Sequence, residues 1–79
     1  MPDQTALWQQ VETIKRRVQN ELGANLPHDF RSTFAYQSYT AMCGEAFWAQ
    51  KNDELDENIL RLLNTAAEKV IETWKTHKG

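Results

Sequence analysis

The sequence predicts an all-α protein of three helices, and three observations support this fold class. Hydrophobic residues recur every three or four positions in three segments, which is the spacing of residues on one helix face. Only three glycines and two prolines are available to interrupt these segments. No run of alternating polar and β-branched residues indicates a strand. We therefore expect one helical domain over residues 1–79, with helices at about 4–22, 27–50 and 54–76.

The first expected helix, over residues 4–22, has the clearest hydrophobic pattern. Asp3 is the expected N-cap, because its carboxylate can accept hydrogen bonds from the unpaired N–H groups of the first turn. Gly23 follows the last hydrophobic residue and can end the helix in the left-handed conformation. The hydrophobic residues form a single stripe made of Leu7, Val11, Ile14, Val18 and Leu22.

The second expected helix, over residues 27–50, is apolar on two sides. Pro27 suits its first position, because the N–H that proline lacks would be unpaired there anyway. A narrow stripe with heptad-like spacing consists of Phe30, Phe34, Gln37, Ala41, Gly44 and Trp48, of which only Gln37 is polar. A broader face consists of Ala35, Tyr36, Tyr39, Met42, Cys43, Ala46 and Phe47. We expect this helix either to be the central helix of a three-helix bundle or to bury one face against a partner.

The third expected helix, over residues 54–76, follows a polar break in which Asn52 or Asp53 is available as the N-cap. Acidic residues at its start and basic residues at its end complement the helix dipole. Its hydrophobic residues cover about half of the helix circumference. They are Leu55, Ile59, Leu60, Leu62, Leu63, Ala66, Ala67, Val70, Ile71 and Trp74.

Length, charge and cysteine content limit the possible classes of protein. A chain of 79 residues supports a thin core, so we expect dimerisation or very regular helix packing to complete it. The single cysteine, Cys43, excludes an internal disulfide and suits a reducing compartment, which predicts a cytoplasmic protein. No signal peptide or membrane-spanning segment is expected. The net charge of −2 lacks the positive excess of a general nucleic-acid binder.

We expect no catalytic residue, no metal site and no cofactor. Cys43 would need a nearby base to act as a nucleophile, and His28 lies about 22 Å away along the same expected helix. The carboxylates of the chain do not form the Glu-x-x-His pairs of helical di-iron sites. The acidic residues at 53–57 are better explained as a helix start.

The expected function is non-enzymatic binding to a second copy of the chain or to another protein, as in an adaptor, an inhibitor or an assembly subunit. Aromatic residues and methionine are enriched at protein interfaces. The predicted interface residues are Tyr36, Tyr39, Met42, Phe47, Trp48 and Trp74. Gly44 in this region permits close approach of another helix or a simple kink, and the sequence does not decide between these.

The sequence is also compatible with two other functions. A nucleic-acid-associated regulator would use the basic cluster Lys15, Arg16 and Arg17 together with Arg31, although acidic residues are interleaved with the cluster. A small-ligand carrier would need an aromatic pocket. Its aromatic residues would come from Trp8, Tyr36, Tyr39, Trp48 and Trp74.

Overall fold

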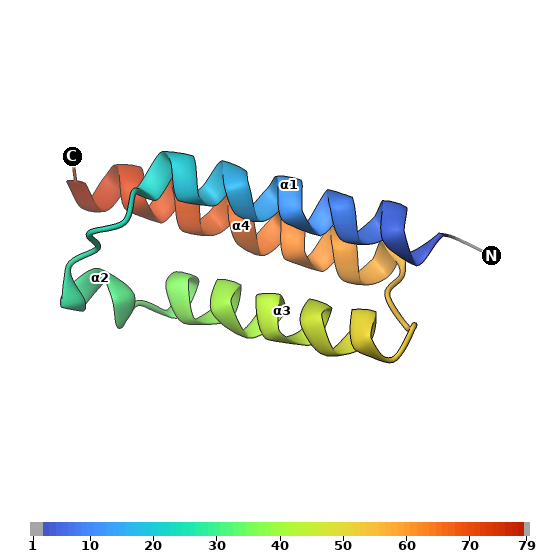
Figure 1. Ribbon diagram of the computed structural model, residues 1–79. Helices are drawn as coiled ribbons and strands as arrows, with labels where there is room; N and C mark the ends of the chain where they lie inside the picture. The colour runs from blue at the N-terminus through green and yellow to red at the C-terminus, as the bar shows by residue number, and fades with distance from the viewer. Residues whose placement is uncertain (1–2, 79) are drawn as a thin grey trace.

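The computed structural model describes residues 3–78, and within that range it contains four helices and no strand. The helices are α1 (Gln4–Leu22), α2 (His28–Arg31), α3 (Phe34–Lys51) and α4 (Glu57–Lys78). The three long helices run side by side as rods, and the short α2 lies where the chain turns between α1 and α3 (Figure 1). The bundle is elongated, with extents of 43 × 18 × 18 Å. The predicted all-α fold is confirmed.

The central helix of the bundle is α4. It packs extensively against both α1 and α3, whereas α1 and α3 contact each other sparsely. Its core residues are Leu60, Leu63, Ala67, Val70 and Ile71. Of the two alternatives for the second expected helix, the central position in the bundle is therefore wrong. The physical reason is that α4 has the widest hydrophobic stripe, whereas α3 is buried mainly through one tyrosine and two alanines, Tyr39, Ala46 and Ala49.

The ends of α1 agree with the prediction, apart from the conformation of Gly23. The Asp3 carboxylate accepts a hydrogen bond from the Thr5 N–H at 3.0 Å. At the other end, the Gly23 N–H donates to the Gln19 carbonyl at 2.8 Å. Gly23 has φ +77° and ψ −175°, which is a region that essentially only glycine adopts and not the left-handed helical region that was expected.

The helix expected over residues 27–50 is divided at Ser32 and Thr33. The Ser32 hydroxyl donates to the His28 carbonyl at 3.1 Å. The Thr33 hydroxyl donates to the Phe30 carbonyl at 2.7 Å and accepts from the Tyr36 N–H at 3.3 Å. Side-chain hydroxyls that bond to the nearby backbone compete with continuation of a helix. Thr33 therefore closes α2 and at the same time caps α3.

This break places Phe30 and Phe34 in opposite environments. Phe30 is fully buried, and the centroid of its ring lies 4.8 Å from that of Trp74 and 5.5 Å from that of His77. Phe34 is 86% exposed. Residues four apart in a continuous helix share one face. The break is thus what allows Phe30 to enter the core while Phe34 stays outside.

The connection from α3 to α4 explains why α4 begins at Glu57 and not at residue 54. The N–H groups of Asp53 and Glu54 donate back to the carbonyls of Gln50 and Ala49, and Asp53 has φ +57°. This pattern is a Schellman motif, which ends a helix. Asn52 and Asp53 therefore close α3 instead of opening α4. The N-cap of α4 is Asp56, whose carboxylate accepts from the Ile59 N–H at 2.9 Å.

Candidate protein-binding surface

The side of α3 that faces away from the bundle forms a continuous exposed surface, which we call the α3 outer face. Its exposed residues are Phe34, Gln37, Thr40, Ala41, Gly44, Phe47 and Trp48. The charged residues of α3 are Glu45 and Lys51, so this face is almost uncharged along 18 residues of helix. The exposed surfaces of α1 and α4 differ from it, because they carry charged residues of both signs, such as Glu12 and Arg16 on α1 and Glu68 and Lys69 on α4.

Two of the three buried residues of α3 are alanines, whereas three of its large aromatic side chains are exposed. Ala46 and Ala49 belong to the core. Trp48 is 63% exposed and Phe47 is 45% exposed, and Phe34 is more exposed than either. Single exposed hydrophobic residues are common, but a contiguous exposed apolar patch typically marks a binding site. The α3 outer face is therefore the strongest candidate for a functional surface among the described residues.

Lys51 covers one end of the α3 outer face. Its ammonium group lies 5.5 Å from the centroid of the Phe47 ring and 5.6 Å from that of Trp48. The two rings meet edge to face, with centroids 6.0 Å apart. Cation–π contacts of this kind are attractive because the ring face carries negative charge density. Lys51 thus stabilises the positions of two of the three exposed aromatic side chains.

The six residues predicted at an interface do not form one surface. The structure places Phe47 and Trp48 on the α3 outer face. The other four side chains pack toward the interior: Tyr39 in the core, and Tyr36, Met42 and Trp74 against it. Apart from Phe47, the broader face of the second expected helix is thus the one turned inward. Tyr39 is not accessible to a partner in the folded chain.

Phe34 is the surface residue that the interface prediction omitted. The sequence pattern places Phe34 on the narrow stripe with Phe30, as part of one continuous helix. The signal that separates them is the adjacent pair Ser32 and Thr33, since hydroxyl side chains in sequence favour helix ends. Applied to the sequence, this signal would have started a new helix at Phe34.

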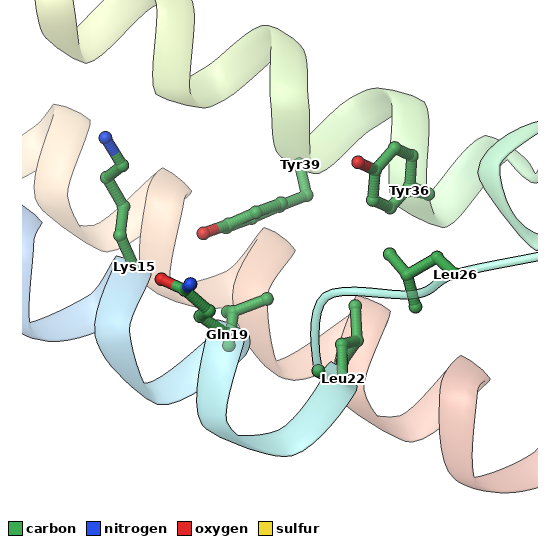
Figure 2. Close-up of a pocket in the computed structure, with 8 residues that line it drawn as sticks. Lys15, Gln19, Leu22, Leu26, Tyr36 and Tyr39 are labelled. Atoms are coloured by element: carbon green, nitrogen blue, oxygen red, sulfur yellow. The ribbon is translucent and has the colours of Figure 1, made fainter.

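A groove between α1 and α3 is the second feature of interest. Tyr39 extends from α3 toward Lys15 and Gln19 of α1 (Figure 2). The hollow has a volume of about 210 Å³, and its apolar lining consists of Val18, Leu22, Leu26, Tyr36 and Tyr39. Sites for drug-sized ligands usually enclose about 300–1,000 Å³. The groove is smaller than that and open to solvent, so its geometry does not favour a small-ligand carrier.

Cys43 lies beside Tyr39 on the inward side of α3. Burial raises the pKa of the Cys43 thiol, and the neighbouring Tyr39 hydroxyl and the charge of Lys15 offset this only in part. Burial, together with the contact with Cys43, also raises the pKa of the Tyr39 phenol. Both groups are therefore neutral at neutral pH. A protonated thiol is a poor nucleophile, because the thiolate is the reactive form.

The basic cluster of α1 does not present its three cations together. Lys15 is half-buried, and its ammonium group lies 6.0 Å from the centroid of the Trp8 ring. Arg16 and Arg17 are exposed to solvent. Residues adjacent in a helix are about 100° apart around its axis. This arrangement does not favour a single phosphate-binding edge.

Residues 3–78 contain neither a metal-binding cluster nor a helix that could span a membrane. No three His, Cys, Asp or Glu side chains of this part of the chain lie close enough together to hold a metal ion. Among the same residues, no helix combines the length and the hydrophobicity that crossing a membrane requires. Comparison of the chain with protein-family models, curated proteins and solved structures finds no match.

Proposed function

We propose that this protein acts by binding another polypeptide through the α3 outer face, without catalysing a reaction. The observation that carries the proposal is the exposure of three large aromatic side chains on one face of a helix whose buried residues are two alanines and one tyrosine. Burying Phe34, Phe47 and Trp48 inside the bundle would have contributed to folding. Leaving them outside is understandable if their burial occurs on association.

The expected energy of binding is consistent with a real but modest interaction. Aromatic side chains bury roughly 150–250 Å² each, so the exposed parts of the three rings amount to about 400 Å². Burial of that area contributes about 10 kcal/mol at roughly 25 cal/mol per Å². Association itself costs about 4–15 kcal/mol. The remaining residues of the face must therefore contribute to a stable complex.

The spacing of the face indicates the shape of the partner. Phe34, Ala41 and Trp48 are seven residues apart, which is two turns of helix. Residues with this spacing lie in line along a helix and can fit a partner helix or a groove of matching length. We therefore expect the partner to present a helical or grooved apolar surface with few charges.

Site-specific photo-crosslinking in cells that make the protein tests the proposed function. A benzophenone side chain replaces Trp48 in one variant and Glu68, on the exposed side of α4, in the control. We expect adducts of defined mass from position 48 and not from position 68. Adding Phe34→Glu to the position-48 variant should abolish them, because it places a charge on the same face. The same diffuse adducts from both positions would contradict the proposal.

We also propose that the protein resides in the cytoplasm. The basis is the single cysteine, which offers no disulfide and lies half-buried against the core. Fractionation of the native cells with an antibody against the folded chain tests this, and recovery outside the cytoplasmic fraction would contradict it.

A further inference from the structure

We infer that the partner of the α3 outer face is a second copy of the same chain, packed antiparallel about a two-fold axis close to Ala41. This inference rests on the proposed function and adds the identity of the partner. A two-fold interface uses the same patch on both copies, so the patch must be complementary to itself. The α3 outer face has this property.

Two of the three bulky residues of the face, Phe34 and Trp48, are placed symmetrically about Ala41. Phe34 lies seven residues before it and Trp48 lies seven residues after it. Each distance is about 10 Å along a helix that rises about 1.5 Å per residue. An antiparallel pair with its axis at Ala41 brings Phe34 of one copy opposite Trp48 of the second copy. This occurs twice, once at each end of the interface, and such aromatic pairs are favourable beyond their burial.

The middle of the face is narrow enough for two helices to meet. Ala41 and Gly44 are both exposed and carry the smallest side chains of the face. The space where a Cβ of Gly44 would stand has no neighbouring atom within 4 Å, so nothing within the chain requires a glycine there. Glycine within a helix costs about 0.5–1 kcal/mol relative to alanine. Close approach of a second helix explains a residue that the monomer does not need.

The same axis also matches Gln37 with Glu45, an exposed residue of α3 beside the face. Gln37 lies four residues before Ala41 and Glu45 lies four residues after it. The amide N–H groups of Gln37 in one copy can therefore donate to the carboxylate of Glu45 in the second copy. This pairing provides partners for the polar residue that interrupts the apolar stripe.

The available area and the rest of the surface favour the second copy over an unrelated chain. The aromatic surface of about 400 Å² is half of the roughly 800 Å² that each partner contributes to a standard interface. The small residues of the face add to it, which corresponds to a small interface and a concentration-dependent dimer. A suitable partner must offer an aromatic helix face with few charges. In residues 3–78, α3 itself is the helix that offers one.

Charge complementation at the axis tests the inference directly. Ala41→Glu places two carboxylates against each other in a homodimer, and Ala41→Lys places two ammonium groups there. Sedimentation from micromolar to millimolar protein should show a dimer for the original chain. Each variant alone should associate about tenfold more weakly or worse, since like charges in contact are unfavourable. An equimolar mixture of the two variants should restore dimerisation as a heterodimer.

Matched controls separate association from folding. Gln9→Glu and Gln9→Lys make charge changes of the same signs on the exposed side of α1 and should leave the dimer unchanged. Position 41 is exposed, so both Ala41 variants should keep the helical circular dichroism of the original chain. A variant that retains this signal and loses the dimer has lost association alone.

Two results would overturn the inference. One is a monomer at all concentrations, and the other is a dimer that the Ala41 variants do not weaken. The crosslinking experiment at position 48 then tests the proposed function independently. Adducts with a different protein would leave the proposed function standing with a different partner, whereas absence of position-specific adducts would remove both.

Discussion

Gln4, in the first turn of α1, holds the backbone of Leu55, in the loop between α3 and α4, through both polar atoms of its side chain. The Leu55 N–H donates to Gln4 Oε1 at 3.1 Å, and Gln4 Nε2 donates to the Leu55 carbonyl at 2.9 Å. The Leu55 side chain is buried. A loop that inserts a hydrophobic side chain into the core needs partners for its peptide groups. The amide of Gln4 provides both partners from 51 residues away.

Replacing Gln4 with alanine should lower the free energy of unfolding by about 1–3 kcal/mol, because one N–H and one carbonyl of a part-buried loop lose their partners. Urea unfolding of both chains measures the difference. Gln9→Ala on the exposed side of the same helix is the control and should change the stability by less than about 0.5 kcal/mol. Equal effects of the two substitutions would show that the Gln4 contacts do not contribute.

Phe30 and Phe34 form a natural pair for testing the break at Ser32 and Thr33. Phe30→Ala should lower the free energy of unfolding by about 3–5 kcal/mol, because it leaves a cavity between α2 and α4. Phe34→Ala should change it by less than about 0.5 kcal/mol when measured at protein concentrations below dimerisation. Comparable losses from both substitutions would mean that α2 and α3 form one helix.

The two glycines at positions 23 and 44 should respond oppositely to alanine. Gly44→Ala should stabilise the monomer by about 0.5–1 kcal/mol, because position 44 is helical and the added Cβ meets no atom within 4 Å. Gly23→Ala meets no atom either, yet it should destabilise the chain because φ is +77° there. Thermal unfolding at low concentration measures both. A stabilising Gly23→Ala would disprove the positive φ.

The stability of the bundle should fall in alkaline solution. Burial raises the pKa values of Tyr39 and Cys43, so the unfolded chain releases these two protons at lower pH than the folded chain does. The contribution of these two groups to the free energy of unfolding is therefore fully present below about pH 8.5. Above that pH it decreases by at most about 1.4 kcal/mol per pH unit for each group. Urea unfolding between neutral and strongly alkaline pH measures the loss.

Substitutions at these two positions identify the source of the pH dependence. Cys43→Ala should remove the earlier part of the alkaline decline, and Tyr39→Phe should remove the later part, because an unperturbed phenol titrates at higher pH than a thiol. Tyr36→Phe is the control, since its ring is only half-buried. A decline that persists unchanged in the double variant Tyr39→Phe, Cys43→Ala would show that other groups cause it.

The parts of the fold that the sequence predicts well depend on local features. The stripe of α1 and its cap at Asp3 lie within a few residues of one another, and the structure agrees with both. The start of α4 was misplaced because Asn52, Asp53 and Asp56 are all suitable caps. The choice among them depends on how α3 ends, through the positive φ of Asp53.

The orientation of α3 could not be predicted from periodicity. Both of its faces are apolar, so the pattern alone does not indicate which one meets α4. That choice depends on contacts between residues distant in sequence, such as Phe30 with Trp74 and His77. Three of the predicted interface residues, Tyr36, Tyr39 and Met42, therefore lie on the face that the bundle uses internally.

Because Ala46 and Ala49 are buried while Phe34 and Trp48 are exposed, selection for folding and selection for binding act on different residues of α3. Larger residues at Ala46 or Ala49 would add volume to a filled core. Selection for folding alone therefore disfavours substitutions at these two positions. Substitutions at Phe34 or Trp48 leave the core untouched. A randomised library selected only for soluble, folded protein should thus keep Ala46 and Ala49 and lose the exposed aromatics. If the exposed aromatic residues are instead retained under selection for growth, the cell needs this surface for a purpose other than folding.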